Sequence, residues 1–129
     1  MFSLEQIAQA HQKVRTGADF PHYIQEIKSF GVIAFETCVK DSHTVYFGNE
    51  DYSISSKAQY ADLDIAIESD AESFKKYLKA HQQGQTDYYQ FCKDCAETGI
   101  EKWMMCLNTM TCIYFNLTGN EILSEKVPH

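Results

Sequence analysis

The sequence predicts an α+β fold, built as an internal duplication of a helix-helix-antiparallel three-stranded meander unit, with the helices packed on one side of a combined sheet. Three observations predict it. A chain of 129 residues with 44% hydrophobic and 13% aromatic residues has the size and composition of one globular domain. The chain resembles itself at a nearly constant spacing, and in each copy two helical stretches precede short strand-like stretches. We therefore expect a single domain over residues 1–129, with copies at about 3–56 and 69–124 linked by 57–68.

The repeat is visible when the two halves are compared position by position. With an offset of 70 residues, Leu4 and His11 correspond to Phe74 and His81. After a two-residue deletion the offset becomes 68 and identical residues recur, namely Asp19 and Asp87, Gly31 and Gly99, Cys38 and Cys106, Tyr46 and Tyr114, and Phe47 and Phe115. Because the helix, glycine and strand signals recur in the same order, we interpret the similarity as a duplication.

The first helix of each copy begins with a capping signal. Ser3 stands at an N-cap with Gln6 three residues later, and Ser69 with Glu72 offers the same capping box in the second copy. Both helices have one apolar face, which we expect to pack against the rest of the domain.

The second helix of each copy is predicted from an N-cap residue, an apolar stripe and a terminating glycine. Asp19 and Asp87 are predicted N-caps, and Pro21 suits the first turn. In the first copy the apolar stripe has helical spacing and consists of Phe20, Tyr23, Ile24 and Ile27. Gly31 and Gly99 are predicted to end these helices.

Strands are predicted after each of these glycines. The segments "VIAFETCV" and "IEKWMMCL" are rich in β-branched and aromatic residues, and "TVYF" and "TCIYF" follow each after a short turn. The segment "LTGN" predicts a further turn and "EILSE" the third strand of its meander. The alternating segment "LDIAI" predicts an additional strand in the link between the copies.

The spacing of Cys92 and Cys95 admits a redox pair, half of a zinc site or two ordinary buried thiols. At the offset of 68 these residues correspond to Ile24 and Ile27, so the other copy places plain apolar side chains there. No second C-x-x-C and no closely spaced histidine pair accompanies them. We therefore interpret them as buried reduced thiols and expect no metal and no cofactor.

The other three cysteines follow the same comparison. Cys38 and Cys106 occupy matched strand positions, which indicates small core residues. Cys112 replaces Thr44 of the first copy, and we expect it to be more exposed.

Charge and hydropathy restrict the partners. With 11 Lys and Arg against 18 Asp and Glu, the formal net charge is −7, which repels a phosphate backbone, so no nucleic acid partner is expected. The N-terminal sequence lacks the pattern of a signal peptide, and no segment is apolar enough to span a membrane, so we expect a cytoplasmic protein without membrane association.

Candidate binding residues come from the matched positions. His11 with His81, and Tyr46 with Tyr114, are pairs of polar side chains that a two-fold arrangement can bring to a shared cleft. The opposing interpretation is that the histidines cap helix ends and that the tyrosines belong to an ordinary half-exposed sheet face. No catalytic residue is predicted, because a phosphate-binding loop, a G-x-S-x-G turn and an H-E-x-x-H motif are all missing from the sequence.

Two hypotheses of function follow. The first is a binding or interaction module that uses an aromatic sheet face for a protein partner or a second copy of itself, with residues 50–62 folded over that face as a lid. The alternative is a small-molecule-binding protein or small enzyme with a pocket at the junction of the two copies.

Three stretches carry a resemblance to a known family: "SLEQIAQAHQKVRTGADFPHYIQEIKSFGV", "HQQGQTDYYQFC" and "GIEKWMMCLNTMTCIYF". Together they resemble the YdfO- and YbcV-like family of short phage and prophage proteins of unknown function, over almost the whole chain. The resemblance implies a compact α+β domain of prophage origin and assigns no catalytic residue.

Overall fold

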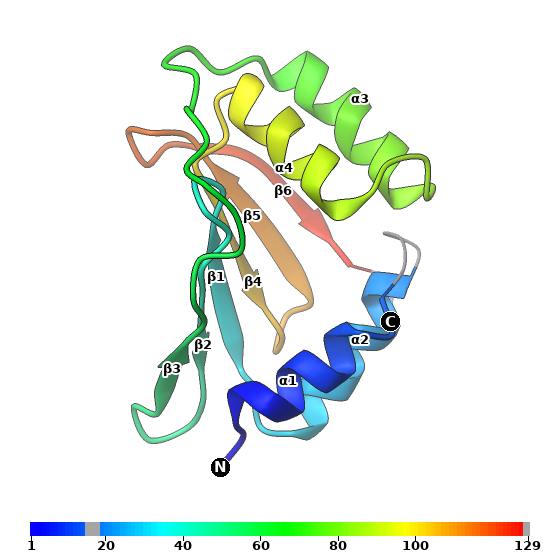
Figure 1. Cartoon of the computed structure of the whole chain (residues 1–129), viewed down its shortest axis with the longest axis vertical. Helices are drawn as coiled ribbons and strands as arrows, with labels where there is room; N and C mark the ends of the chain where they lie inside the picture. The colour runs from blue at the N-terminus through cyan, green and yellow to red at the C-terminus, as the bar shows by residue number, and fades with distance from the viewer. Residues whose placement is uncertain (15–18, 128–129) are drawn as a thin grey trace.

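The computed structural model describes residues 1–14 and 19–127. In these ranges the chain forms four helices and six strands (Figure 1). In chain order these are α1 (Leu4–His11), α2 (Phe20–Ser29), β1 (Ala34–Cys38), β2 (Thr44–Phe47), β3 (Ser53–Ser55), α3 (Ala71–Gln82), α4 (Tyr88–Glu97), β4 (Lys102–Cys106), β5 (Thr111–Phe115) and β6 (Glu121–Lys126). The predicted α+β class is confirmed.

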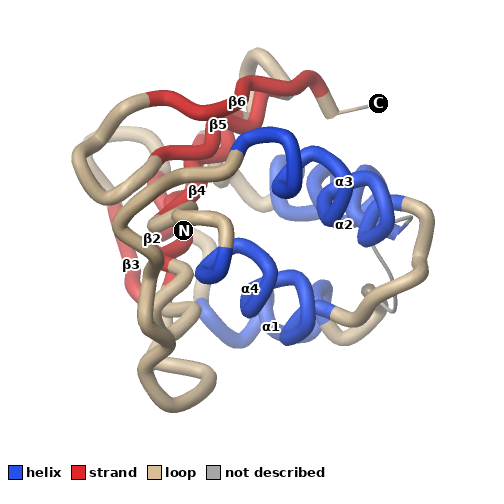
Figure 2. Tube along the Cα trace, turned by 90° about the horizontal axis from the view of Figure 1, so that it is seen from above, coloured by secondary structure: helices blue, strands red, loops and turns tan. Residues whose placement is uncertain are grey.

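The strands form one antiparallel sheet in the order β3-β2-β1-β4-β5-β6. Seen from above, the strands lie on one side of the molecule and the helices on the other (Figure 2). Helices α1 and α2 cover the lower part of the sheet in Figure 1, and α3 and α4 cover the upper part. One face of the sheet is therefore covered by helices and the other is not.

The strand registers are consistent with the predicted duplication. β1 and β4 are neighbours at the centre, where Glu36 pairs with Met104, its own counterpart at the offset of 68. The first hairpin of each half also has the same register, as in the pairs Phe35 with Tyr46 and Trp103 with Tyr114. The last strands differ, because a bulge between β5 and β6 pairs Tyr114 with Leu123.

Three of the four helix starts use a side-chain cap. Ser3 and Gln6 form the predicted capping box of α1, with bonds of 3.2 Å and 2.9 Å between each side chain and the other backbone N–H. Asp87 accepts the Gln90 N–H at the start of α4, as predicted. The cap of α3 is Asp70 and not Ser69, because the Asp70 carboxylate accepts the N–H three residues later.

The start of α2 departs from the prediction. Asp19 occupies the N-cap position of α2, but its side chain makes no capping hydrogen bond. Its backbone is already helical, with φ −86° and ψ −7°, whereas a capping residue normally adopts an extended conformation.

The core between the helices and the sheet includes the C-x-x-C residues. Cys92 and Cys95 of α4 are both 0% exposed, as are their counterparts Ile24 and Ile27 of α2. Burial also raises the pKa of both thiols, which keeps them protonated. The prediction of buried reduced thiols at these two positions is confirmed.

The other cysteines lie where the sequence did not place them. Cys38 and Cys106 are half-buried on the uncovered face of the sheet, so the prediction of core positions is wrong. Each is the last residue of its strand, and buried and half-buried side chains alternate along both strands. Each cysteine therefore lies on the face opposite the buried side chains. Cys112 is 4% exposed on the covered face, so the expectation of greater exposure is also wrong.

The segment that links the halves forms no strand at residues 63–67. Its backbone bonds to other elements instead, with the Leu63 N–H on the Lys40 carbonyl and the Ala66 N–H on the Ala96 carbonyl. Leu63 and Ile65 pack against the core from this irregular path. Alternate residues of this segment therefore pack on the core although the segment has no neighbouring strand.

A candidate ligand cleft between the two halves

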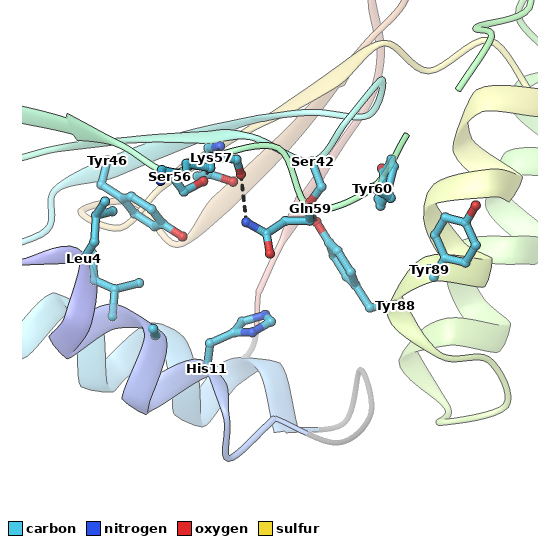
Figure 3. A pocket seen from close by; sticks show the side chains of 13 residues that line it. Leu4, His11, Ser42, Tyr46, Ser56, Lys57, Gln59, Tyr60, Tyr88 and Tyr89 are labelled. Atoms are coloured by element: carbon cyan, nitrogen blue, oxygen red, sulfur yellow. Dashed lines mark hydrogen bonds between the residues drawn. The ribbon is translucent and has the colours of Figure 1, made fainter. Parts of the chain in front are cut away.

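A cleft of about 730 Å³ lies where the first half meets the second. Helix α1 forms one wall, residues 56–60 and strand β2 form another, and the start of α4 closes one end (Figure 3). The volume is within the range of small-molecule sites in proteins.

Helix α1 presents its less polar side to the cleft. Leu4, Ile7 and Ala8 line this wall, and Ile7 is also anchored in the core at 2% exposure. Leu4 is 39% exposed, and Ala8 is exposed as well. The small side chain of Ala8 leaves room beside the helix that a larger residue would fill.

Four tyrosines line the opposite side and the end of the cleft: Tyr46, Tyr60, Tyr88 and Tyr89. The rings of Tyr60 and Tyr89 lie 5.1 Å apart. The Tyr60 hydroxyl donates to the Val39 carbonyl, and the Tyr88 hydroxyl lies 2.6 Å from Ser42 Oγ. These bonds fix two of the rings in place, so the cleft has a preformed aromatic lining.

The Tyr46 hydroxyl points into the cleft (Figure 3). It shares hydrogen bonds with the side chains of Tyr23 and Thr44. Burial raises the pKa of both phenols. Tyr46 is therefore protonated at neutral pH, and its hydroxyl has both donor and acceptor capacity.

His11 and Gln59 face each other across the cleft (Figure 3). The His11 ring packs edge-on against Tyr23 and Tyr88, with centroid separations of 5.3 Å and 6.1 Å. Desolvation among these rings lowers its pKa, so the imidazole is neutral at pH 7. The Gln59 Nε2 donates to the Lys57 carbonyl at 2.7 Å, which leaves Oε1 directed toward the cleft.

The structure separates the predicted site residues into two groups. His11 and Tyr46 line the cleft, whereas His81 and Tyr114 do not. His81 stacks on Phe91 at 4.4 Å, and its Nδ1 lies 3.2 Å from the Thr86 carbonyl. Tyr114 is 7% exposed within the core.

The expected aromatic sheet face is divided differently from the prediction. Tyr46 and Tyr114 lie on the covered face, because each pairs with a buried residue of the neighbouring strand. The uncovered face has half-buried Phe47 and Phe115, with an ion pair of 3.0 Å between Lys102 and Glu36. Residues 56–60 line the cleft on the covered side, so the expected lid over the uncovered face is wrong.

Several cleft residues were missed by the sequence analysis. Tyr88 and Tyr89 follow the predicted cap Asp87, and a paired aromatic at a helix start was the available signal. Gln59 and Tyr60 lie within residues 50–62, which the sequence predicts as a lid over the other face. The path of the chain there follows from contacts with distant residues such as Asp41. No local pattern indicates those contacts.

Metal-binding clusters and membrane-spanning helices are both absent from residues 1–14 and 19–127. In these ranges no group of three or more His, Cys, Asp or Glu side chains is placed to hold a metal ion. None of the helices found there combines the length and the apolar character needed to traverse a bilayer.

Acidification is expected to destabilise the fold. Partial desolvation by neighbouring rings lowers the pKa of His11 and His81, whereas an unfolded histidine titrates near pH 6.5. Below about pH 6.5 the unfolded chain therefore binds more protons than the folded chain, and stability decreases as the pH falls. We expect a lower urea midpoint at pH 5.5 than at pH 7.5.

The histidine origin of this effect can be isolated. Asp41 and Asp70 have pKa values below their usual range, so they lose their contributions only below about pH 4. The variant His81→Gln should show a smaller difference between the two urea midpoints than the parent chain. A midpoint that rises on acidification would contradict the argument.

Comparison with known proteins gives one family match. The model of the family described as "Protein of unknown function (DUF1398)" matches residues 8–126. No curated protein matches the chain.

Proposed function

Because the chain belongs to this family of proteins of unknown function, we propose its role from the geometry: a small-molecule-binding protein whose ligand occupies the cleft between the two halves. The observation that carries the proposal is the convergence of His11, Tyr46 and Gln59 on one preformed, aromatic-lined space. An aromatic cleft with a few converging polar groups is typical of ligand sites.

The second half of the chain supports this proposal by contrast. There the ring of Phe74, from α3, packs 4.9 Å from Tyr114, the counterpart of Tyr46. Helix α1 has the sequence LEQIAQAH and so contains no Phe, Tyr or Trp that could cover Tyr46 in the same way. The protein fills this position from within in one half and leaves it open in the other. We infer that a ligand supplies the missing apolar group.

An interaction module that uses the uncovered sheet face stays a second prediction. The half-buried apolar residues of that face favour it, in particular Phe47, Met104, Ile113 and Phe115. The cytoplasmic location and the prophage origin implied by the resemblance also stay predictions. Enzymatic activity is not part of the proposal.

Binding can be tested with indole, a neutral aromatic probe, by backbone-amide NMR. We expect saturable shifts at α1, residues 56–60 and the start of α4, with a dissociation constant on the order of 1–10 mM for so small a molecule. The variant Ala8→Phe places a phenyl ring in the cleft and should weaken binding by more than about tenfold.

The matched control is Gln9→Phe, which adds the same ring to an exposed neighbouring position of α1 that does not line the cleft. It should bind indole like the parent chain. Equal binding by both variants, or shifts centred on Phe47 and Phe115, would overturn the proposal and favour the uncovered face.

A further inference from the structure

The charge of the cleft restricts its ligand. Among the described residues that line it, Lys57 is the one with a formal charge at pH 7, and Asp and Glu are absent. A cationic ligand would lose its hydration on entering the cleft and would find no carboxylate there to replace it. An anionic ligand would find a single exposed ammonium group in a protein of net charge −7. A neutral ligand is therefore the best match.

The polar groups restrict the ligand further. Gln59 Oε1 is an acceptor, because the amide nitrogen of the same side chain already donates to the Lys57 carbonyl. The Tyr46 hydroxyl, which also contacts the Tyr23 and Thr44 side chains, has one O–H donor and two acceptor lone pairs, and a ligand carbonyl would use the donor. The neutral His11 ring beside them has one donor and one acceptor nitrogen. A donor and an acceptor that face the same space are the complement of an amide or lactam edge.

The apolar lining of the cleft indicates the chemistry of the rest of the ligand. Four tyrosine rings and the apolar wall of α1 line the space beside these polar groups, which is open to solvent on one side. The filled half shows that an aromatic ring packs well on the counterpart of Tyr46, since Phe74 and Tyr114 meet edge to face at 60°. An aromatic ligand ring packed edge to face against Tyr46 would reproduce that contact.

We propose that the cleft binds a neutral aromatic amide or lactam, whose ring lies against Tyr46 and whose amide edge bonds to Gln59 Oε1 and the Tyr46 hydroxyl. This inference rests on the proposed function and adds the chemical class of the ligand. The amide N–H donates to Gln59, and the amide carbonyl accepts from Tyr46.

Three probes of similar size test the class: benzamide, benzoate and benzylamine, which are neutral, anionic and cationic at pH 7. In NMR titrations of the full chain we expect benzamide to bind at least about fivefold more tightly than either charged probe. The variant Gln59→Leu removes the acceptor and should weaken benzamide binding about fivefold, with little change for benzoate.

The substitution is suited to the purpose because Gln59 is exposed and its backbone N–H bonds to the Asp41 carbonyl at 2.7 Å, which the variant keeps. Tighter binding of benzoate or benzylamine in the cleft would overturn the ligand class and leave the proposed function standing. Benzamide binding unaffected by Gln59→Leu would also overturn the class. Failure of all three probes to shift cleft residues would overturn both proposals.

Discussion

Replacing Gly99 by alanine is expected to lower the free energy of unfolding by about 3 kcal/mol. Gly99 follows α4 with φ +83°, a conformation that costs an ordinary residue about 1–2 kcal/mol. An added Cβ would also lie 2.7 Å from both the Glu68 carbonyl oxygen and the Ser69 Cα. These are backbone atoms, and the bond of 2.9 Å from the Asp70 N–H to the Thr98 carbonyl holds their segment in place. Urea unfolding would measure the loss.

Gly119→Ala is the matched control for this prediction. Gly119 has nearly the same dihedral angle, φ +82°, but an added Cβ there would meet nothing within 4 Å. It should therefore lose only the conformational part, about 1 kcal/mol. Equal losses in the two variants would show that the close approach of residues 68–69 to Gly99 contributes nothing to stability.

Local rules were sufficient to predict much of the fold. The Ser3 cap, the Asp87 cap and the glycine positions after α2 and α4 depend on residues within one turn of each other, and the structure has all of them. Comparison of the halves predicted the burial of Cys92 and Cys95, because equivalent stripes of equivalent helices pack alike.

Errors arose where contacts distant in sequence decide the outcome. The alternation at residues 63–67 is compatible with a strand, but a strand needs a neighbour with free backbone groups. The backbone of this segment bonds to the turn after β1 and to the end of α4 instead. Similarly, alternation along β1 and β4 could show that Cys38 and Cys106 share a face, but not which face the helices cover.

The candidate site was only half predictable for a related reason. The repeat predicts two histidines and two tyrosines as equivalent site residues. Of these four, only His11 and Tyr46 line the cleft. Leu4 and Phe74 occupy matched positions but differ in side-chain size. The match alone does not show which of the two side chains fills the space beside its tyrosine. Whether a helix position fills a space depends on the helix placement as well as on the residue type.

The Phe74 side chain is expected to be a large contributor to stability, so Phe74→Ala should cost about 4 kcal/mol of unfolding free energy. Phe74 is 0% exposed, and its ring lies 4.9 Å from that of Tyr114 and 6.3 Å from that of Phe91. Truncation removes these contacts and leaves a cavity that the surrounding rings can only partly close. Urea or thermal unfolding of the variant would measure the cost.

The counterpart variant Leu4→Ala separates packing from ligand binding. Leu4 is 39% exposed on the cleft wall, so its truncation should cost less than about 1 kcal/mol. If the open half had evolved only as a weaker copy of the filled half, Leu4→Phe should stabilise the chain and leave indole binding unchanged. We expect instead that Leu4→Phe weakens indole binding, because the added ring competes for the space beside Tyr46. Similar losses for Phe74→Ala and Leu4→Ala would mean that the first half is as fully packed as the second, which would leave no room for a ligand.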